Sequence, residues 1–339
     1  MSSVRHRIIN YLWKIRLIEY KNFSPWLLNV TGTEMENKEE NKKTKKAKPP
    51  LWFQWAMSQQ SSSHLVDVGN CPIHYLLWKA TSKTKKQGGL LFVHGGGGHS
   101  HWWSFLAPFF SNDFEVAALD LSGMGESGHR AEYSAEIRSE ELLKVIEDAN
   151  LGENVFVIGH SFGGLTATKF AQKYGKLISG LILADSPIRP PEINAKRKVR
   201  RMGNKKHYAD YKTALDRFRL MPEQDCENDF LVQHIGHHSI KEEQEGWTWK
   251  FDGKAMHNRR FTEPYHTYLE EISCKTALVY GDESSLLDIK TVNYMTSLMK
   301  EGSPIVGIPE AKHHLFLDQP IAFIAVIRSI LHQWNNKLF

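Results

Sequence analysis

The 339-residue chain contains few cysteines and no long uninterrupted apolar run. Its three cysteines, Cys71, Cys226 and Cys274, are odd in number and lack the spacing of metal ligands, which favours free thiols in a reducing compartment. No segment approaches the roughly 18 apolar residues of a membrane-spanning helix. Near the start, basic residues such as Arg5 and Arg7 interrupt the apolar ones, which argues against a secretory signal. We therefore expect a cytoplasmic protein without a transmembrane segment.

Excess positive charge is confined to the first 50 residues. They hold 11 Lys and Arg against 5 Glu, so they account for the formal net charge of +5 and leave the rest of the chain close to neutral. A neutral body gives no indication of nucleic-acid binding, and we expect no such partner. The helical spacing of Ile8, Leu12, Ile15 and Ile18 suits an amphipathic surface or organelle-targeting helix, with a poorly ordered extension as the alternative.

The rest of the chain divides by its hydrophobic pattern. Residues 1–63 are predicted to be an N-terminal extension with a charged linker at 31–50. Short apolar runs then alternate with amphipathic stretches over 64–187 and 266–339, which is typical of an α/β fold with a mostly parallel sheet and helices on both faces. Residues 188–265 contain no comparable strand and are too long for a loop, so we expect an inserted helical cap. The predicted strands are 64–68, 72–80, 90–93, 116–121, 155–158, 181–184, 277–280 and 304–308, and the main predicted helices are 136–149, 164–174, 292–300 and 321–334.

A candidate nucleophile follows the predicted strand at 155–158. Residues 159–164 read Gly-His-Ser-Phe-Gly-Gly and lead into a predicted helix, which is the context of a nucleophile elbow. The glycines allow strand and helix to approach closely around a strained Ser161. The N–H of Phe162 would then be one donor of an oxyanion hole.

A second glycine-rich loop supplies the other expected donor. Residues 94–103 read His-Gly-Gly-Gly-Gly-His-Ser-His-Trp-Trp, and the Gly96 amide is predicted to complete the oxyanion hole. The loop has neither a Gly-Lys-Ser/Thr triplet nor a dinucleotide fingerprint, which disfavours phosphate binding. A general base should come after the last strand, where either His313 or His314 would serve. We expect no cofactor and no metal.

With these motifs, the chain from about residue 64 onward resembles the α/β-hydrolase superfamily, in its capped, serine esterase-like branch. The segment Leu-Asp-Leu-Ser-Gly-Met-Gly-Glu-Ser at 119–127 is similar to the superfamily's segment after the fourth strand. The resemblance implies an α/β-hydrolase fold, and it selects His313 as the base from its distance to Pro320. Epoxide hydrolases and dehalogenases of this superfamily require an Asp nucleophile, so Ser161 argues against both activities.

The third member of the triad departs from the superfamily's usual pattern. The turn Gly281-Asp282-Glu283-Ser284 places a serine where the acid normally stands. Some members carry the acid after the sixth strand instead, which here is Asp185. We favour Asp185, with Asp282 or Glu283 as the alternative acid.

These residues predict a serine hydrolase that cleaves an ester-type bond through an acyl-enzyme on Ser161. The partner would be a small apolar ester or acyl substrate, and the oligomeric state is left open. A carbon–carbon bond hydrolase or lyase with the same triad, and a non-catalytic ligand-binding protein of the same fold, remain alternatives. Four tryptophans are predicted to line the substrate pocket, or else to join cap and core: Trp102, Trp103, Trp247 and Trp249.

Overall fold

The computed structural model of the chain describes residues 48–82, 87–195, 205–256 and 263–335. The predicted N-terminal amphipathic helix, nearly all of the charged linker and most of the basic run at 197–206 lie outside these residues. Within them, no helix has both the length and the apolarity needed to cross a bilayer.

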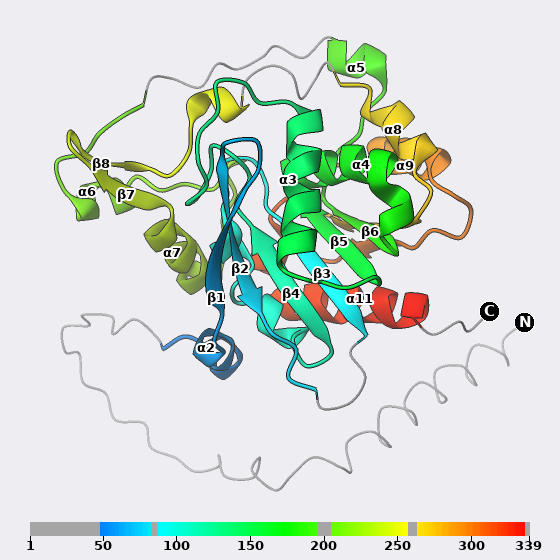
Figure 1. Cartoon of the computed structure of the whole chain (residues 1–339), viewed down its shortest axis with the longest axis horizontal. Helices are drawn as coiled ribbons and strands as arrows, with labels where there is room; N and C mark the ends of the chain where they lie inside the picture. The colour runs from blue at the N-terminus through cyan, green and yellow to red at the C-terminus, as the bar shows by residue number, and fades with distance from the viewer. Residues whose placement is uncertain (1–47, 83–86, 196–204, 257–262, 336–339) are drawn as a thin grey trace, which may run out of the picture. The chain divides into compact units, whose positions relative to one another are not determined.

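An eight-stranded sheet in the order β1-β2-β4-β3-β5-β6-β9-β10 forms the centre of the fold (Figure 1). Strands β3 to β10 of this sheet run parallel, and β2 joins β4 antiparallel as half of the β1–β2 hairpin. The predicted mostly parallel sheet is confirmed. The strands are β1 Ser62–Asp67, β2 Pro72–Trp78, β3 Gly88–Val93, β4 Phe114–Leu119, β5 Val155–His160, β6 Gly180–Ala184, β9 Lys275–Gly281 and β10 Ile305–Ile308.

Successive side chains of each buried strand point to opposite sides of the sheet, so both faces are apolar and both are covered by helices. On β3, Leu91 and Val93 belong to the cluster that includes side chains of α3, α4, α8 and α9, whereas Leu90 and Phe92 belong to the cluster of α11. Figure 1 shows α3 and α4 in front of the strands and α11 behind them. The helices are α3 Ala135–Asp148, α4 Phe162–Tyr174, α8 Tyr265–Glu271, α9 Ile289–Leu298, α10 Leu315–Asp318 and α11 Pro320–Asn335, with 3-10 turns at Ser100–Trp102, Ala107–Phe109 and Gly175–Leu177.

The predicted cap lies between β6 and β9, and it is not entirely helical. A two-stranded antiparallel hairpin pairs Ile240 with Trp249 and Glu243 with Gly246. Alternating aromatic and polar residues favour this strand structure, and Gly246 adopts the positive φ of 118° that the turn requires. Figure 1 shows the hairpin together with α6 and α7, apart from α5 and α8. The described elements are α5 Pro191–Ala195, α6 Tyr211–Leu215, α7 Asp229–His238, β7 Ile240–Glu243, β8 Gly246–Trp249 and the 3-10 turn Gly253–Met256.

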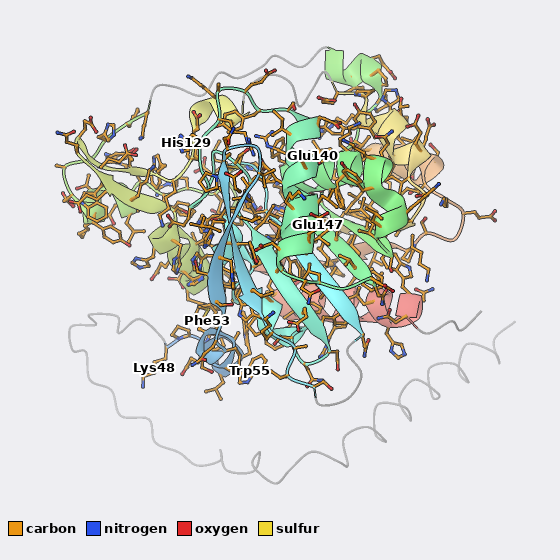
Figure 2. The ribbon with its side chains drawn as sticks, viewed as in Figure 1. Lys48, Phe53, Trp55, His129, Glu140 and Glu147 are labelled. Atoms are coloured by element: carbon orange, nitrogen blue, oxygen red, sulfur yellow. The ribbon has the colours of Figure 1, made fainter. Side chains whose placement is uncertain are left out.

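The N-terminal boundary of the folded unit also differs from the prediction. Helix α2, Leu51–Ser58, lies inside the predicted extension but belongs to the compact unit Pro49–Phe339. The physical reason is Phe53, which is buried and packs edge-to-face on Phe230 of α7 with ring centroids 5.1 Å apart. Figure 2 shows Phe53 and Trp55 on this short helix. An eight-residue helix gains most of its stability from such contacts rather than from its propensity.

We expect Phe53→Ala to lower the free energy of unfolding by about 3 kcal/mol, because it removes a buried aromatic side chain that packs on both Phe105 and Phe230. Trp55→Ala on the same helix is the matched control, because Trp55 is 45% exposed. Urea unfolding followed by circular dichroism would measure both variants. Equal effects of the two substitutions would contradict this account of how α2 is held.

Candidate active site

Ser161 occupies the sharp turn between β5 and α4. Its backbone angles of φ 53° and ψ −119° are unfavourable for a residue with a side chain. The turn is possible because two glycines, which have no side chain, allow the backbone around Ser161 to approach neighbouring backbone closely. A Cβ on Gly163 would lie 2.3 Å from the carbonyl oxygen of His94, and a Cβ on Gly159 would lie 2.6 Å from Cα of Gly164. The predicted elbow geometry is therefore present at the carboxyl edge of the sheet.

His313 connects the candidate nucleophile to an acid. Its Nε2 lies 3.0 Å from Oγ of Ser161, and its Nδ1 lies 2.7 Å from Oδ1 of Asp185. An ionised carboxylate can only accept, so Nδ1–H donates to Asp185 and the lone pair of Nε2 accepts the hydroxyl proton of Ser161. Both His313 and Asp185 are buried, whereas Ser161 is partly exposed. The three side chains thus form one hydrogen-bonded row.

Asp185 is held in place by contacts from the turn after β9. Its Oδ2 accepts the N–H of Gly281 at 3.0 Å, and its Oδ1 accepts the hydroxyl of Ser284 at 2.7 Å. The alternative acids of that turn, Asp282 and Glu283, are exposed, and Nδ1 of His313 is directed to Asp185. The geometry therefore favours Asp185, which was the preferred acid on sequence grounds.

Ser284 was missed as a functional residue, although its position was noted as a departure from the superfamily pattern. The serine now supplies a hydrogen bond to the acid instead of being the acid. We expect Ser284→Ala to lower kcat/KM about tenfold, because a hydrogen bond to a charged group contributes about 1.5–3 kcal/mol. Ser285→Ala, at the exposed neighbouring position, is the control for ester hydrolysis assays. An unchanged kcat/KM for Ser284→Ala would show that the backbone alone orients Asp185.

The two predicted oxyanion donors belong to segments that lie against each other. Phe162 is the first residue of α4, whose first N–H groups have no partner within the helix. The glycine loop approaches from β3: a Cβ on Gly95 would lie 3.4 Å from Cβ of Ser161. Gly96, the next residue, is partly exposed. This arrangement is compatible with donation by Gly96 and Phe162 to one substrate oxygen.

Asp120 holds the end of the glycine loop by hydrogen bonds. Its carboxylate accepts the N–H of Ser100 and the ring N–H of His74, the latter at 2.8 Å. Burial opposes ionisation, but the hydrogen bond from His74 and the neighbouring histidines outweigh it, so the pKa of Asp120 lies below its usual range. His94 also has a structural role, because its Nε2 accepts the N–H of Leu121 at 3.0 Å.

Two further histidines surround His313. His160 is buried beside it, and Nε2–H of His160 donates to the carbonyl oxygen of His313 at 3.0 Å. Burial lowers the pKa of both His160 and His314, so both rings remain neutral. His160 therefore supports the loop that carries His313 without adding a charge beside it.

The four tryptophans predicted to line the pocket do not form one surface. Trp103 is fully buried against Phe316, with ring centroids 4.8 Å apart, so its assignment to a pocket was wrong. The 3-10 turn after the glycine loop directs this residue into the core, where an apolar ring is most stable. Trp102 does lie beside the site, 5.2 Å from the ring of His314. On β8, Trp247 packs on Tyr211 and Trp249 packs on Tyr208.

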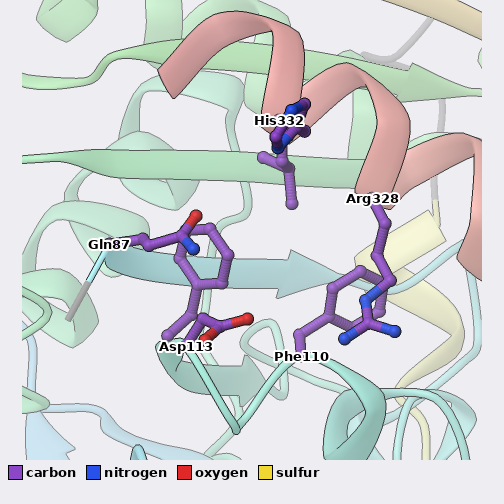
Figure 3. A pocket seen from close by; sticks show the side chains of 7 residues that line it. Gln87, Phe110, Asp113, Arg328 and His332 are labelled. Carbon is purple, nitrogen blue, oxygen red and sulfur yellow. The ribbon is translucent and has the colours of Figure 1, made fainter. Parts of the chain in front are cut away.

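A surface pocket elsewhere in the molecule has no connection to these residues. It includes Gln87 and Asp113, which precede β3 and β4, together with Arg328 and His332 of α11 (Figure 3). It therefore lies at the amino ends of these parallel strands. Ser161 follows the carboxyl end of β5, the edge where α/β sheets bind their ligands.

Known proteins share this fold and part of this sequence. An esterase of Mycobacterium tuberculosis is 26% identical over 251 residues, which cover 71% of this chain and 82% of that protein. Epoxide hydrolase 1 of Caenorhabditis elegans is 22% identical over 363 residues, covering 98% of this chain and 85% of that protein. Among solved structures, a thioesterase domain from the curacin biosynthetic pathway superposes with a TM-score of 0.64 at 22% identity, covering 79% of this chain and 99% of that one.

A comparison with protein-family models shows which family the chain belongs to. A model of the alpha/beta hydrolase fold family matches residues 89–320, which is more than half of the chain and contains Ser161, Asp185 and His313. The match also contains the segment between β6 and β9, the elbow at Ser161 and the parallel strands from β4 to β10. The chain therefore belongs to the α/β-hydrolase family and is a hydrolase.

Proposed function

We propose that this hydrolase cleaves carboxylic esters through an acyl-enzyme on Ser161. The observation that carries the proposal is the hydrogen-bonded row in which His313 lies 3.0 Å from Oγ of Ser161 and 2.7 Å from Asp185. As Oγ attacks the ester carbonyl, Nε2 of His313 takes its proton. Asp185 holds the ring in the required tautomer and stabilises the imidazolium.

The remaining steps use the same groups. The Gly96 and Phe162 amides would donate to the carbonyl oxygen as it becomes negative. Collapse of the tetrahedral intermediate expels the alkoxide, which receives the proton from His313 and leaves as an alcohol. Water, deprotonated by His313, then attacks the acyl-enzyme. Collapse of this second intermediate releases the acid product, and Oγ of Ser161 takes the proton back from His313.

The identity of the nucleophile favours an ester over an epoxide. The relatives described above include both an esterase and an epoxide hydrolase, so similarity alone supports only the hydrolase family. A serine next to a histidine base suits acyl transfer, because its hydroxyl gains nucleophilicity when the base removes its proton. A small apolar ester is the substrate class that we propose, with Trp102 beside the site as an apolar contact.

A panel of p-nitrophenyl esters of graded acyl length tests the proposal. The wild-type protein should hydrolyse at least the shorter esters, with a preference that depends on chain length, because a site of fixed shape discriminates acyl groups. Ser161→Ala provides the background rate. Failure of the wild-type protein to exceed that background with every ester would contradict esterase activity.

We also propose that residues 188–265 act as a cap and that catalysis requires only the unit from Pro49 onward. Deletion of residues 1–47 should leave kcat/KM essentially unchanged, because Ser161, His313, Asp185 and the proposed cap all lie after Pro49. The deletion spares the carbonyl of Pro50, which accepts the N–H of Phe53 at the start of α2. A large loss of turnover in folded truncated protein would show that the N-terminal residues take part in catalysis.

We propose a reducing compartment for the protein, since Cys71, Cys226 and Cys274 are all free thiols in the structure. Burial raises the pKa of Cys226 and of Cys274 to about 11, which keeps both as neutral thiols. Imaging of a fluorescent fusion of the full chain in its own cells would test the compartment.

A further inference from the structure

A cluster of three histidines lies between the proposed cap and the core. His234 and His238 belong to α7, and His101 belongs to the 3-10 turn Ser100–Trp102 after the glycine loop. Each offers one ring nitrogen, and these nitrogens all lie within 4.8 Å of one another. All three side chains are partly exposed, so an ion could reach them from solvent.

The backbone places these side chains before any ion arrives. His234 and His238 are four residues apart on a helix and therefore share one face. His101 is held opposite them, because the N–H of the preceding Ser100 donates to the buried carboxylate of Asp120. A side-chain contact also links the start of this turn to the end of α7, where Nε2 of His99 lies 2.9 Å from Oγ of Ser239. The cluster thus consists of residues on two elements that are already in contact.

The hydrogen bonds around His234 determine which of its ring nitrogens carries the proton. The hydroxyl of Ser104 donates to the carbonyl oxygen of His101 at 2.9 Å, so its oxygen accepts Nε2–H of His234 at 2.8 Å. This network assigns the lone pair of His234 to Nδ1. Histidines that bind metals commonly have their other ring nitrogen fixed by such a partner.

The chemistry of the cluster also suits a transition-metal cation. A metal binds a histidine through the lone pair of its neutral imidazole. Neutral imidazoles are ligands for Zn²⁺, Cu²⁺ and Ni²⁺.

We propose that His101, His234 and His238 form a binding site for a divalent transition-metal ion such as Zn²⁺, which would fasten the proposed cap to the loop after β3. His101 and His238 now stack with ring centroids 3.6 Å apart, so binding requires their side chains to rotate until the nitrogens converge. Zn–N bonds of about 2.0–2.1 Å place tetrahedral ligand nitrogens roughly 3.4 Å apart. Water would complete the coordination. The proposal does not depend on the proposed esterase activity.

Calorimetric titration of the full chain with ZnCl₂ tests the site directly. We expect binding that weakens at least about tenfold in His101→Ala and in His238→Ala, because each removes a ligand. His237→Ala is the matched control: His237 is the exposed neighbour of His238 on α7, and its Nδ1 interacts with the hydroxyl of Tyr211. The affinity of the His237→Ala variant for Zn²⁺ should equal that of the wild-type protein.

Among the residues that the structure describes, two other groups of possible ligands must be separated from this site, namely His160 with His313 and His314, and His207 with Glu243 and Glu245. Hydrolysis is unsuitable as the readout, because Zn²⁺ on His313 would inhibit it directly. Binding should instead persist in His313→Ala and in His207→Ala. Unchanged affinity in His101→Ala and His238→Ala, or no detectable Zn²⁺ binding to the wild-type protein, would overturn the proposal.

A second measurement covers the case in which an alanine variant fails to fold. The wild-type protein loaded with Cu²⁺ should show nitrogen hyperfine structure from imidazole ligands in its electron paramagnetic resonance spectrum. Ser104→Ala, which removes the partner of Nε2 of His234 and the hydroxyl that donates to the carbonyl of His101 but leaves all three ligands in place, should weaken Zn²⁺ binding about tenfold or more. A Cu²⁺ spectrum without nitrogen ligands, or full affinity in Ser104→Ala, would count against the site.

Discussion

Ser161→Ala should lower kcat for ester hydrolysis by about a million-fold, which is the loss seen when the nucleophile of a serine protease triad is removed. The loss of kcat is this large because the three side chains of the triad act together. Without Oγ, His313 has no hydroxyl to activate, and the remaining amides can only polarise a substrate that water attacks. The measurement is single-turnover and steady-state hydrolysis of the best p-nitrophenyl ester.

The same variant should remain folded, which separates chemistry from stability. Alanine keeps Cβ and removes one partly exposed oxygen, so thermal unfolding should match that of the wild-type protein. Hydrolysis by Ser161→Ala at close to the wild-type rate would show that another residue is the nucleophile, and the proposed mechanism would then be wrong.

Asp185→Asn should lower kcat by about 10⁴, the loss found when the corresponding acid of a serine protease is replaced by its amide. The amide preserves the shape of the side chain, but its nitrogen can donate to Nδ1 of His313, which favours the wrong tautomer for accepting the proton of Ser161. The contacts from Gly281 and Ser284 would also lose their charged acceptor. The pH dependence of kcat should change with the identity of the group facing His313.

Asp282→Asn and Glu283→Gln are the controls for this assignment. Both side chains are exposed on the turn next to Ser284, so their replacement should change kcat little. If either control lost activity by orders of magnitude while Asp185→Asn remained active, the acid would belong to the turn after β9.

Local motifs in the sequence predicted the strands and the elbow because short-range geometry determines both. The glycines around Ser161 are required by contacts with residues a few positions away, or with the neighbouring strand, so their spacing carries the information. The same applies to His313, whose place before Pro320 follows from the family resemblance. Asp185 was predicted from its position at the end of a strand. In the structure its carboxylate contacts His313 directly, at 2.7 Å.

Other features depend on long-range packing, which the sequence pattern does not contain. Trp102 and Trp103 are adjacent in the sequence, yet Trp102 lies beside His314 and Trp103 lies in the core. The short helix at Leu51–Ser58 was missed because its stability comes from contacts with distant aromatic residues. In the metal site that we propose, His234 and His238 form a local pair on α7, but His101 lies more than a hundred residues away in the sequence, so the pattern alone does not predict the third ligand.

Labelling with a fluorophosphonate probe, followed by peptide mass spectrometry, tests the central claim most directly, because the probe reacts with an activated serine and reports its position. The account predicts one adduct on the peptide that contains Ser161, no adduct in Ser161→Ala, and much slower labelling of Asp185→Asn. A folded wild-type protein that remains unlabelled, or one that carries the adduct on a different serine, would contradict it.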